Sequence, residues 1–109
     1  MENQAKEIFP YCTRNGKIPF KVWYEALRDI RVRSKIGIRI ERMENGNFGD
    51  CSYVGDGVFE MRINFGPGYR VYFGRDGEKI IILLCGGDKS TQQKDIKRAK
   101  AYWIDYNGR

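Results

Sequence analysis

Histidine is absent from this 109-residue chain, and its absence excludes several kinds of catalytic site. Imidazole acid–base catalysis, histidine-bound metal ions and cysteine–histidine nucleophile pairs all require it. Cysteine occurs three times, as Cys12, Cys51 and Cys85, at no spacing typical of a metal site. Because the number is odd and two of the three lie in apolar or strand contexts, we expect reduced thiols in a cytoplasmic protein and no bound metal.

Long hydrophobic runs are also missing. The apolar segment Ile80–Cys85 has the length of a strand and is far too short to span a membrane. The first twelve residues lack the basic start and long apolar stretch of a secretory signal, so we expect no membrane partner. No repeat, low-complexity tract or linker divides the chain, and residues 1–109 are expected to form one domain.

Positive charge is in excess. Twenty lysines and arginines against fourteen acidic residues give a net charge of +6 and a pI near 9.3. The segment from Lys21 to Arg42 has seven basic and three acidic residues, so it holds four of these net charges in about one fifth of the chain. Such clustering favours a polyanionic partner: nucleic acid, the ribosome or an acidic protein.

The first half of the chain predicts a short edge strand within Glu7–Cys12 and two helices. One helix begins at Pro19, with a stripe that includes Val22, Trp23 and Ile30; the other begins near Val32 and ends at Asn45-Gly46. Beside the apolar stripe of the second helix, basic residues recur at helical spacing. This basic ridge is either a solvated face or an RNA-binding surface, and it consists of Arg31, Lys35, Arg39 and Arg42.

The second half predicts an antiparallel meander followed by a last helix. Its strands are Val58–Phe65, Tyr69–Gly74 and Lys79–Cys85, and the helix starts with a capping box of Ser90 and Gln93. We therefore expect an α+β fold, in which an N-terminal helical hairpin packs on one face of a twisted antiparallel sheet of three or four strands, with a C-terminal helix in addition. The second face of the sheet is expected to carry polar residues.

That polar face is the predicted site. Pairing of its strands brings Arg62 close to Arg70, and guanidinium groups so close together are unfavourable unless an anion joins them. Internal carboxylates would make the cluster a surface ion-pair network; a bound phosphodiester would make it an RNA-cleavage site. In the second case Arg62, Arg70 and Lys89 stabilise charge on the phosphate, and Glu60 is the candidate base because histidine is absent.

Aromatic residues lie among these cations. Tyr69 and Tyr72 are candidate RNA-binding residues, since an unpaired base stacked on an aromatic ring contributes about 1–3 kcal/mol. Tyrosines also fill cores and end strands, and for any single one of them that structural role is the commoner. The general acid stays open between Tyr72, Tyr69, Tyr102 and a lysine.

Several motifs together resemble the RelE/ParE toxin superfamily, and its HigB-like addiction-module killer proteins most closely. They are LRD, GNFGD, VGDGVFEMRINFGPGYRVYFGRDG, ILLCGGDKSTQ and DIKRAKAYW, within a likeness that runs from about Phe20 to Tyr106. The resemblance implies a small α+β toxin of a type II toxin–antitoxin system. It implies catalytic basic residues at Arg62, Arg70 and Lys89, and Arg70 matches most directly through its GYR context. Glu60 departs from a lysine that relatives can have there, and the late catalytic tyrosine of RelE has no clear counterpart, since position 96 is isoleucine.

The resemblance leaves two activities. The first is a ribosome-dependent mRNA endoribonuclease that needs no metal or organic cofactor, docks on ribosomal RNA through the basic ridge and blocks translation. The alternative is a non-catalytic, ParE-like inhibitor of DNA gyrase; a degenerate toxin that only binds its antitoxin is a third option. The implied partners are a cognate helix-turn-helix antitoxin, the ribosome and mRNA, with operator DNA bound only through the antitoxin complex.

Overall fold

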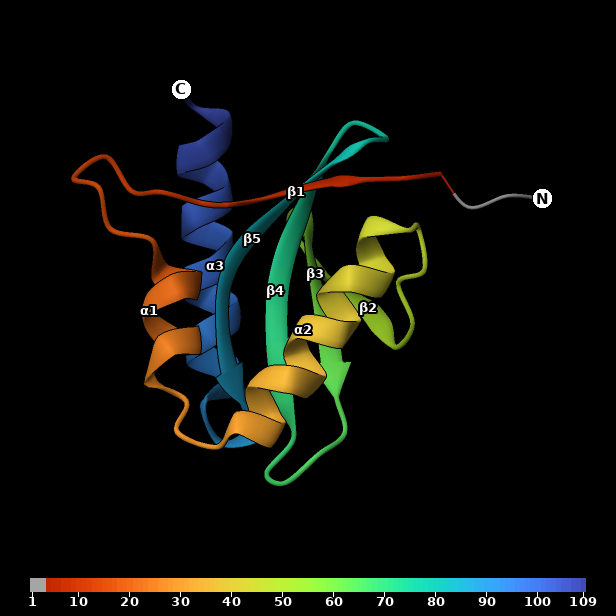
Figure 1. Ribbon diagram of the computed structural model, residues 1–109. Helices are drawn as coiled ribbons and strands as arrows, with labels where there is room; N and C mark the ends of the chain where they lie inside the picture. The colour runs from red at the N-terminus through yellow and green to blue at the C-terminus, as the bar shows by residue number, and fades with distance from the viewer. Residues whose placement is uncertain (1–3) are drawn as a thin grey trace.

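The computed structural model describes residues 4–109 and arranges them as a five-stranded mixed sheet with helices on both of its faces (Figure 1). The order of the strands in space is β1-β5-β4-β3-β2, in which β1 is parallel to β5 and all other neighbours are antiparallel. The α+β class is confirmed. In chain order the elements are β1 (Glu7–Pro10), α1 (Pro19–Ala26), α2 (Ile30–Glu44), β2 (Cys51–Gly55), β3 (Val58–Ile63), β4 (Tyr69–Asp76), β5 (Ile80–Asp88), the short 3-10 turn η1 (Lys89–Thr91) and α3 (Gln92–Asn107).

The sheet is larger than the sequence predicts, and it is not wholly antiparallel. The expected edge strand is present as β1, but it joins the sheet in parallel with β5. Strand β2 was not anticipated. It pairs with β3 across a tight turn in which Gly55, Asp56 and Gly57 all have positive φ. The strand itself is short and only partly buried, so its sequence CSYVG has little hydrophobic pattern.

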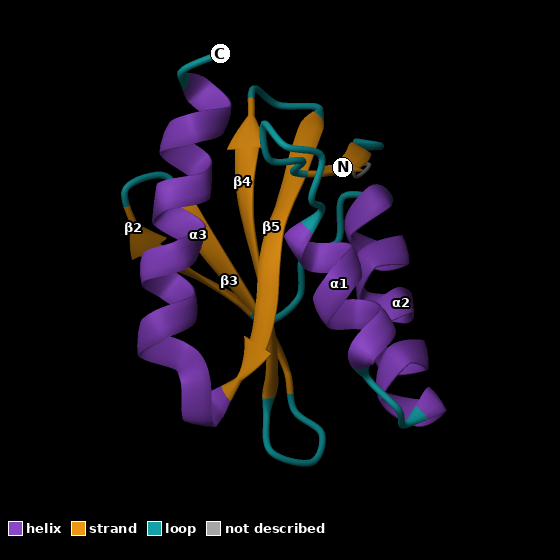
Figure 2. Ribbon diagram, turned by 90° about the vertical axis from the view of Figure 1, so that its left-hand side faces the viewer, coloured by secondary structure: helices purple, strands orange, loops and turns teal. Residues whose placement is uncertain are grey.

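Helices α1 and α2 cover one face of the sheet, and α2 is the longer of the two (Figures 1 and 2). Helix α2 begins two residues earlier than predicted, because the side chain of Asp29 caps its first turn and accepts a hydrogen bond from the Arg31 amide at 2.9 Å. It ends at Asn45 and Gly46, as predicted. The core beneath it consists of Val32, Ile36, Met43, Met61, Ile63, Val71, Phe73, Ile81 and Leu83.

Helix α3 covers the opposite face, where the sequence predicted exposed polar residues (Figure 2). That expectation is wrong for most of the face, because Val58, Tyr72 and Leu84 point toward α3 and form a second core with Ala99. The indole of Trp103 lies so close to β4 that a Cβ at Gly74 would be 2.4 Å from its ring. In the middle of β3 and β4, Glu60 and Tyr72 are therefore enclosed beneath α3, whereas Arg75 and Asp76 at the end of β4 are exposed.

The start of α3 differs in one detail from the prediction. The capping box is formed by Asp88 and Thr91 around η1, rather than by Ser90 and Gln93. The Asp88 carboxylate accepts a hydrogen bond from the Ser90 amide at 2.8 Å, so the chain turns directly from the end of β5 into η1 and α3. Within residues 4–109, no helix combines the length and the apolar character that crossing a membrane requires.

Candidate nucleic-acid interface

The four residues predicted to be catalytic lie together at one end of the sheet. In the antiparallel register of β3 and β4, Arg62 lies directly opposite Arg70, and Glu60 lies opposite Tyr72. Arg70 in turn lies opposite Gly87 of β5, two residues before Lys89. Strands β3 and β4 and the start of η1 after β5 therefore bring the four residues to one region. In Figure 1 this region is at the lower end, beside the β3–β4 loop.

Glu60 is the centre of a buried polar network. Its side chain is enclosed, with the residue only 1% exposed, and its Oε2 accepts hydrogen bonds from the Tyr72 hydroxyl at 3.1 Å and the Gln92 amide at 2.9 Å. The same carboxylate lies 3.5 Å from Nε of Arg70 and 3.7 Å from Nη1 of Arg62. An enclosed carboxylate cannot meet the 2′-hydroxyl of an RNA strand. The predicted role of general base therefore does not fit Glu60, which instead holds two guanidinium groups in place.

Arg62 is shared between two carboxylates. Its Nη2 lies 2.9 Å from Oδ1 of Asp50 and also donates to the Ser52 hydroxyl at 2.9 Å. The hydrogen bond between Asp50 and Arg62 lowers the pKa of the carboxyl group and raises that of the guanidinium. Both side chains remain more than one third exposed, so a phosphate arriving from solvent can compete with Asp50 for Arg62.

Arg70 and Lys89 line an open cavity of about 360 Å³ next to the β3–β4 loop. The guanidinium of Arg70 is largely enclosed: its Nη1 donates to the Gly68 carbonyl at 3.2 Å, and its buried Nε lacks a hydrogen bond of good geometry although Glu60 is near. Lys89 is exposed and has no carboxylate within 4 Å in the described part of the chain. None of the described residues that line the cavity is acidic: Asn64, Phe65, Gly66, Pro67, Gly68, Arg70 and Lys89.

The two tyrosines proposed as base-stacking residues have different surroundings. Tyr72 is 0% exposed, so neither face of its ring can receive a base and the prediction is wrong for this residue. Burial raises the pKa of its hydroxyl, with Glu60 as the next cause, and the hydroxyl therefore stays a neutral donor to Glu60. Tyr69 is half-buried, packs against the core beneath α2 and lies beside the β3–β4 loop, where its ring is 3.7 Å from the position of a Cβ at Gly66. The aromatic residue that lines the Arg70 cavity is Phe65, which sequence reasoning missed.

The basic ridge of α2 is not a uniform row of free cations. Arg31 pairs with Asp29 at 2.9 Å, and Arg39 donates hydrogen bonds to the backbone carbonyls of Arg62 and Phe48. Arg39 therefore joins α2 to β3 and to the loop between α2 and β2. Lys35 and Arg42 are exposed, and no carboxylate lies within 4 Å of either among residues 4–109.

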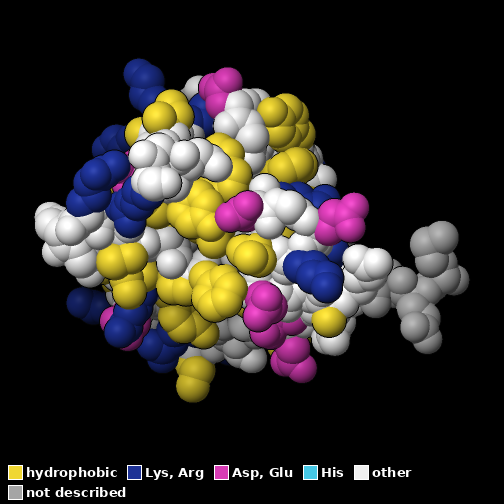
Figure 3. Space-filling view, turned by 90° about the horizontal axis from the view of Figure 1, so that it is seen from above, with side chains coloured by type: hydrophobic (Ala, Val, Ile, Leu, Met, Phe, Trp, Pro, Cys, Tyr) yellow, Lys and Arg dark blue, Asp and Glu magenta, His cyan; other side chains and the backbone are white. Residues whose placement is uncertain are grey.

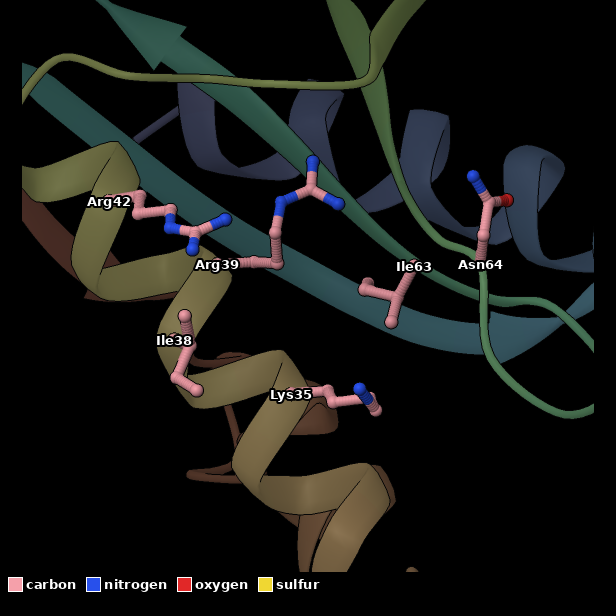
Figure 4. A pocket seen from close by; sticks show the side chains of 6 residues that line it. All are labelled: Lys35, Ile38, Arg39, Arg42, Ile63 and Asn64. Carbon is pink, nitrogen blue, oxygen red and sulfur yellow. The ribbon is translucent and has the colours of Figure 1, made fainter.

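A second cavity, of about 260 Å³, lies between α2 and the end of β3 (Figure 4). Figure 4 shows the side chains of Lys35 and Arg39 extending from α2 toward Ile63 and Asn64. The described residues that line this cavity are Lys35, Ile38, Arg39, Arg42, Ile63 and Asn64, which again include no acid. The opposite end of the molecule, seen from above in Figure 3, has acidic and basic side chains mixed with hydrophobic ones.

Comparison with known proteins places the chain in a family. The family described as Phage derived protein Gp49-like (DUF891) matches residues 25–102, a range that includes the ridge, both cavities and the Glu60 network. A Haemophilus influenzae (strain ATCC 51907 / DSM 11121 / KW20 / Rd) protein that bears only the description "Uncharacterized protein" is 53% identical over 83 residues, which cover 76% of this chain and 84% of the relative. The chain therefore belongs to the Gp49-like family, a toxin–antitoxin-associated family of RelE-like toxins whose members have an antitoxin as partner.

Proposed function

We propose that this protein is a HigB-like toxin that cleaves mRNA on the ribosome and thereby blocks translation. The observation that supports this proposal is the open cavity lined by Arg70 of β4 and Lys89 of η1, with Arg62 alongside and no acidic residue in the described lining. A site of this kind suits a phosphodiester, because it supplies fixed positive charge where the reacting phosphate becomes more negative. A protein that inhibits gyrase through protein contacts has no need of it.

Cleavage of RNA through its own 2′-hydroxyl makes three demands: removal of the hydroxyl proton, stabilisation of the phosphate charge and protonation of the leaving 5′-oxygen. Arg70 and Lys89 meet the second, and Arg62 joins them when it leaves Asp50. Glu60 acts as a positioning residue that keeps Arg70 directed at the cavity. Lys89 is the exposed ammonium in the lining, and we assign it the protonation of the leaving oxygen. The proton of the 2′-hydroxyl passes to solvent water, because the described lining holds no carboxylate that could take it.

The remaining surfaces have roles in the same proposal. The basic ridge docks on ribosomal RNA through Lys35 and Arg42, the two exposed members whose side chains make neither an ion pair nor a hydrogen bond within residues 4–109. Tyr69 lies at the border of the β3–β4 loop, where the base next to the scissile phosphate would stack. The antitoxin is a helix-turn-helix protein encoded beside the toxin, and operator DNA is bound only by the complex of the two.

The test is expression of Lys89→Ala in a bacterial host, compared with wild type and with Lys97→Ala. Lys89 is exposed and takes no part in the Glu60 network, so its removal leaves the fold intact. Wild type and Lys97→Ala, which changes an exposed lysine of α3, should both arrest growth. With Lys89→Ala, full-length transcripts should be lost at least tenfold more slowly than with wild type.

Mapping of transcript 5′ ends after induction identifies the activity. Cuts in phase with codons, confined to translated regions, support the nuclease. Gyrase–DNA adducts with intact transcripts would identify the gyrase inhibitor instead. Full toxicity of Lys89→Ala at equal expression would contradict the assignment of the cavity.

A further inference from the structure

We infer that the cavity between α2 and β3 is a second phosphate-binding subsite, which holds the part of the RNA strand next to the phosphate in the Arg70 cavity. This inference rests on the proposed function. It assigns the surface around Lys35 and Arg42 to the substrate strand itself, in addition to any contact with the ribosome. The path runs from Arg70 and Lys89, over the β3–β4 loop, to the exposed face of α2.

The two cavities are neighbours. Asn64 lines both of them, so they meet at the first residue of the β3–β4 loop. Phe65 lines the Arg70 cavity, and its ring centroid lies 4.9 Å from Nζ of Lys35, which lines the α2 cavity. A strand that leaves one cavity across this loop therefore enters the other without crossing any other element.

The charges of the second cavity select its ligand. Lys35, Arg39 and Arg42 line it, and the described lining includes no acid. Arg39 is held by two backbone carbonyls, which fixes its guanidinium but does not neutralise it. Three cations so close together repel one another unless an anion lies between them. A phosphodiester supplies that anion, and repeated phosphates allow one strand to fill both cavities.

The remaining lining suits the sugar and base that accompany the phosphate. Ile38 is 45% exposed at the edge of the cavity and Ile63 lies at its base, so two apolar side chains lie beside the cations. The volume of about 260 Å³ is sufficient for a phosphate with part of its nucleoside. Phe65 lies between the two cavities with Arg31 and Lys35 over its ring, at a position where a base could stack.

Binding of short RNAs tests the inference without cleavage and without ribosomes. The probes are a fluorescent hexauridylate and a fluorescent uridylyl dinucleotide, both with 2′-O-methyl riboses so that they cannot be cut. The variant is Lys35→Ala/Arg42→Ala, because both side chains are exposed and neither makes a hydrogen bond or ion pair in the described structure. The matched control is Lys94→Ala/Lys97→Ala, which removes two exposed lysines of α3.

Fluorescence anisotropy at several salt concentrations gives the result. Each phosphate contact contributes about 0.7 to the salt slope for a single strand, which corresponds to about fivefold in affinity at 0.1 M salt. We therefore expect the Lys35→Ala/Arg42→Ala variant to bind the hexamer about 25-fold more weakly, with a slope smaller by about 1.4. Its affinity for the dinucleotide, whose one phosphate occupies the Arg70 cavity, should equal that of wild type. The control variant should bind both probes like wild type.

Two outcomes would overturn the inference. Hexamer affinity within twofold of wild type would show that Lys35 and Arg42 do not hold the substrate strand. Equal losses for the two probes would show that the second cavity is not a separate subsite. Failure of the proposed function is a separate result. If no transcript is cleaved in the host but the hexamer pattern holds, the nuclease proposal fails and the subsite stands.

Discussion

Replacement of Glu60 by glutamine tests whether a buried negative charge holds the site together. The substitution keeps the shape of the side chain and an oxygen that can accept from Tyr72 and Gln92, but it removes the charge between Arg62 and Arg70. Arg62 retains Asp50 and is partly exposed, so its share of the loss is about 0–1 kcal/mol. Arg70 is only 12% exposed and has no other carboxylate within 4 Å in the described structure.

Removal of one partner from a buried ion pair typically costs about 3–5 kcal/mol. The separation of 3.5 Å and the poor hydrogen-bond geometry at Nε of Arg70 place this pair at or below the lower end of that range. Together with the share of Arg62, we expect Glu60→Gln to lower the free energy of unfolding by about 2–4 kcal/mol. With about 2.1 cal/mol/K of unfolding entropy per residue, the melting temperature of a chain of this length falls by about 9–17 °C.

Thermal unfolding followed by circular dichroism at pH 7 provides the measurement. Glu25→Gln is the control, because Glu25 is exposed on α1 and makes no ion pair within residues 4–109. The control should melt within about 2 °C of wild type. A double-mutant cycle with Arg70→Gln should show that the second substitution costs much less once the first is present. Additive losses, or a melting temperature for Glu60→Gln that matches the control, would refute the anchoring role of Glu60.

Two further predictions concern the carboxylates at either end of the molecule. Asp50→Asn should free Arg62 for phosphate and raise the affinity for the 2′-O-methyl hexamer about fivefold at 0.1 M salt; unchanged or weaker binding would contradict the competition between Asp50 and RNA. Asp105 has a pKa well below its ordinary value because the Tyr11 hydroxyl and Arg14 donate hydrogen bonds to it. Its ionised form therefore stabilises the folded state above pH ~3.9, and this stabilisation is lost as the pH falls further. Asp105→Asn should therefore melt below wild type at pH 7 and approach it as pH falls below ~4, whereas an equal gap at both pH values would show that Asp105 acts without its charge.

Much of the site could be predicted because strands obey a strict alternation. The period of two in β3 and β4 is enough to place Arg62 and Glu60 on one face and to bring Arg62 opposite Arg70 across a Gly-Pro-Gly turn. The α+β class follows from the same change of period along the chain. The basic ridge followed from helical spacing, although its members differ in their contacts.

The errors come from packing between elements, which local patterns do not encode. A glutamate that alternates with apolar residues looks like a surface residue, and only the position of α3 over β3 and β4 reveals that Glu60 and Tyr72 are enclosed. Helical spacing also assigned Val22 and Ile30 to one apolar stripe of the first helix, although they are 55% and 71% exposed and α1 ends at Ala26. Ile30 is the first residue of α2 and faces solvent because Asp29 starts the helix earlier than its apolar period suggests.

Burial of Glu60 also explains how three cations are tolerated so close together. Arg62, Arg70 and Lys89 bring three positive charges, and Glu60 and Asp50 bring two negative ones, which leaves a net charge of +1. That balance attracts one phosphodiester without strong self-repulsion beforehand. The transition state of strand cleavage has a second negative charge, and the exposed pair of Arg62 and Asp50 is the one that can open to meet it. The enclosed carboxylate of Glu60 therefore fixes the positions of the guanidinium groups, while the exposed carboxylate of Asp50 adjusts the charge of the site. Of the two, only the loss of Asp50 should raise the affinity for RNA.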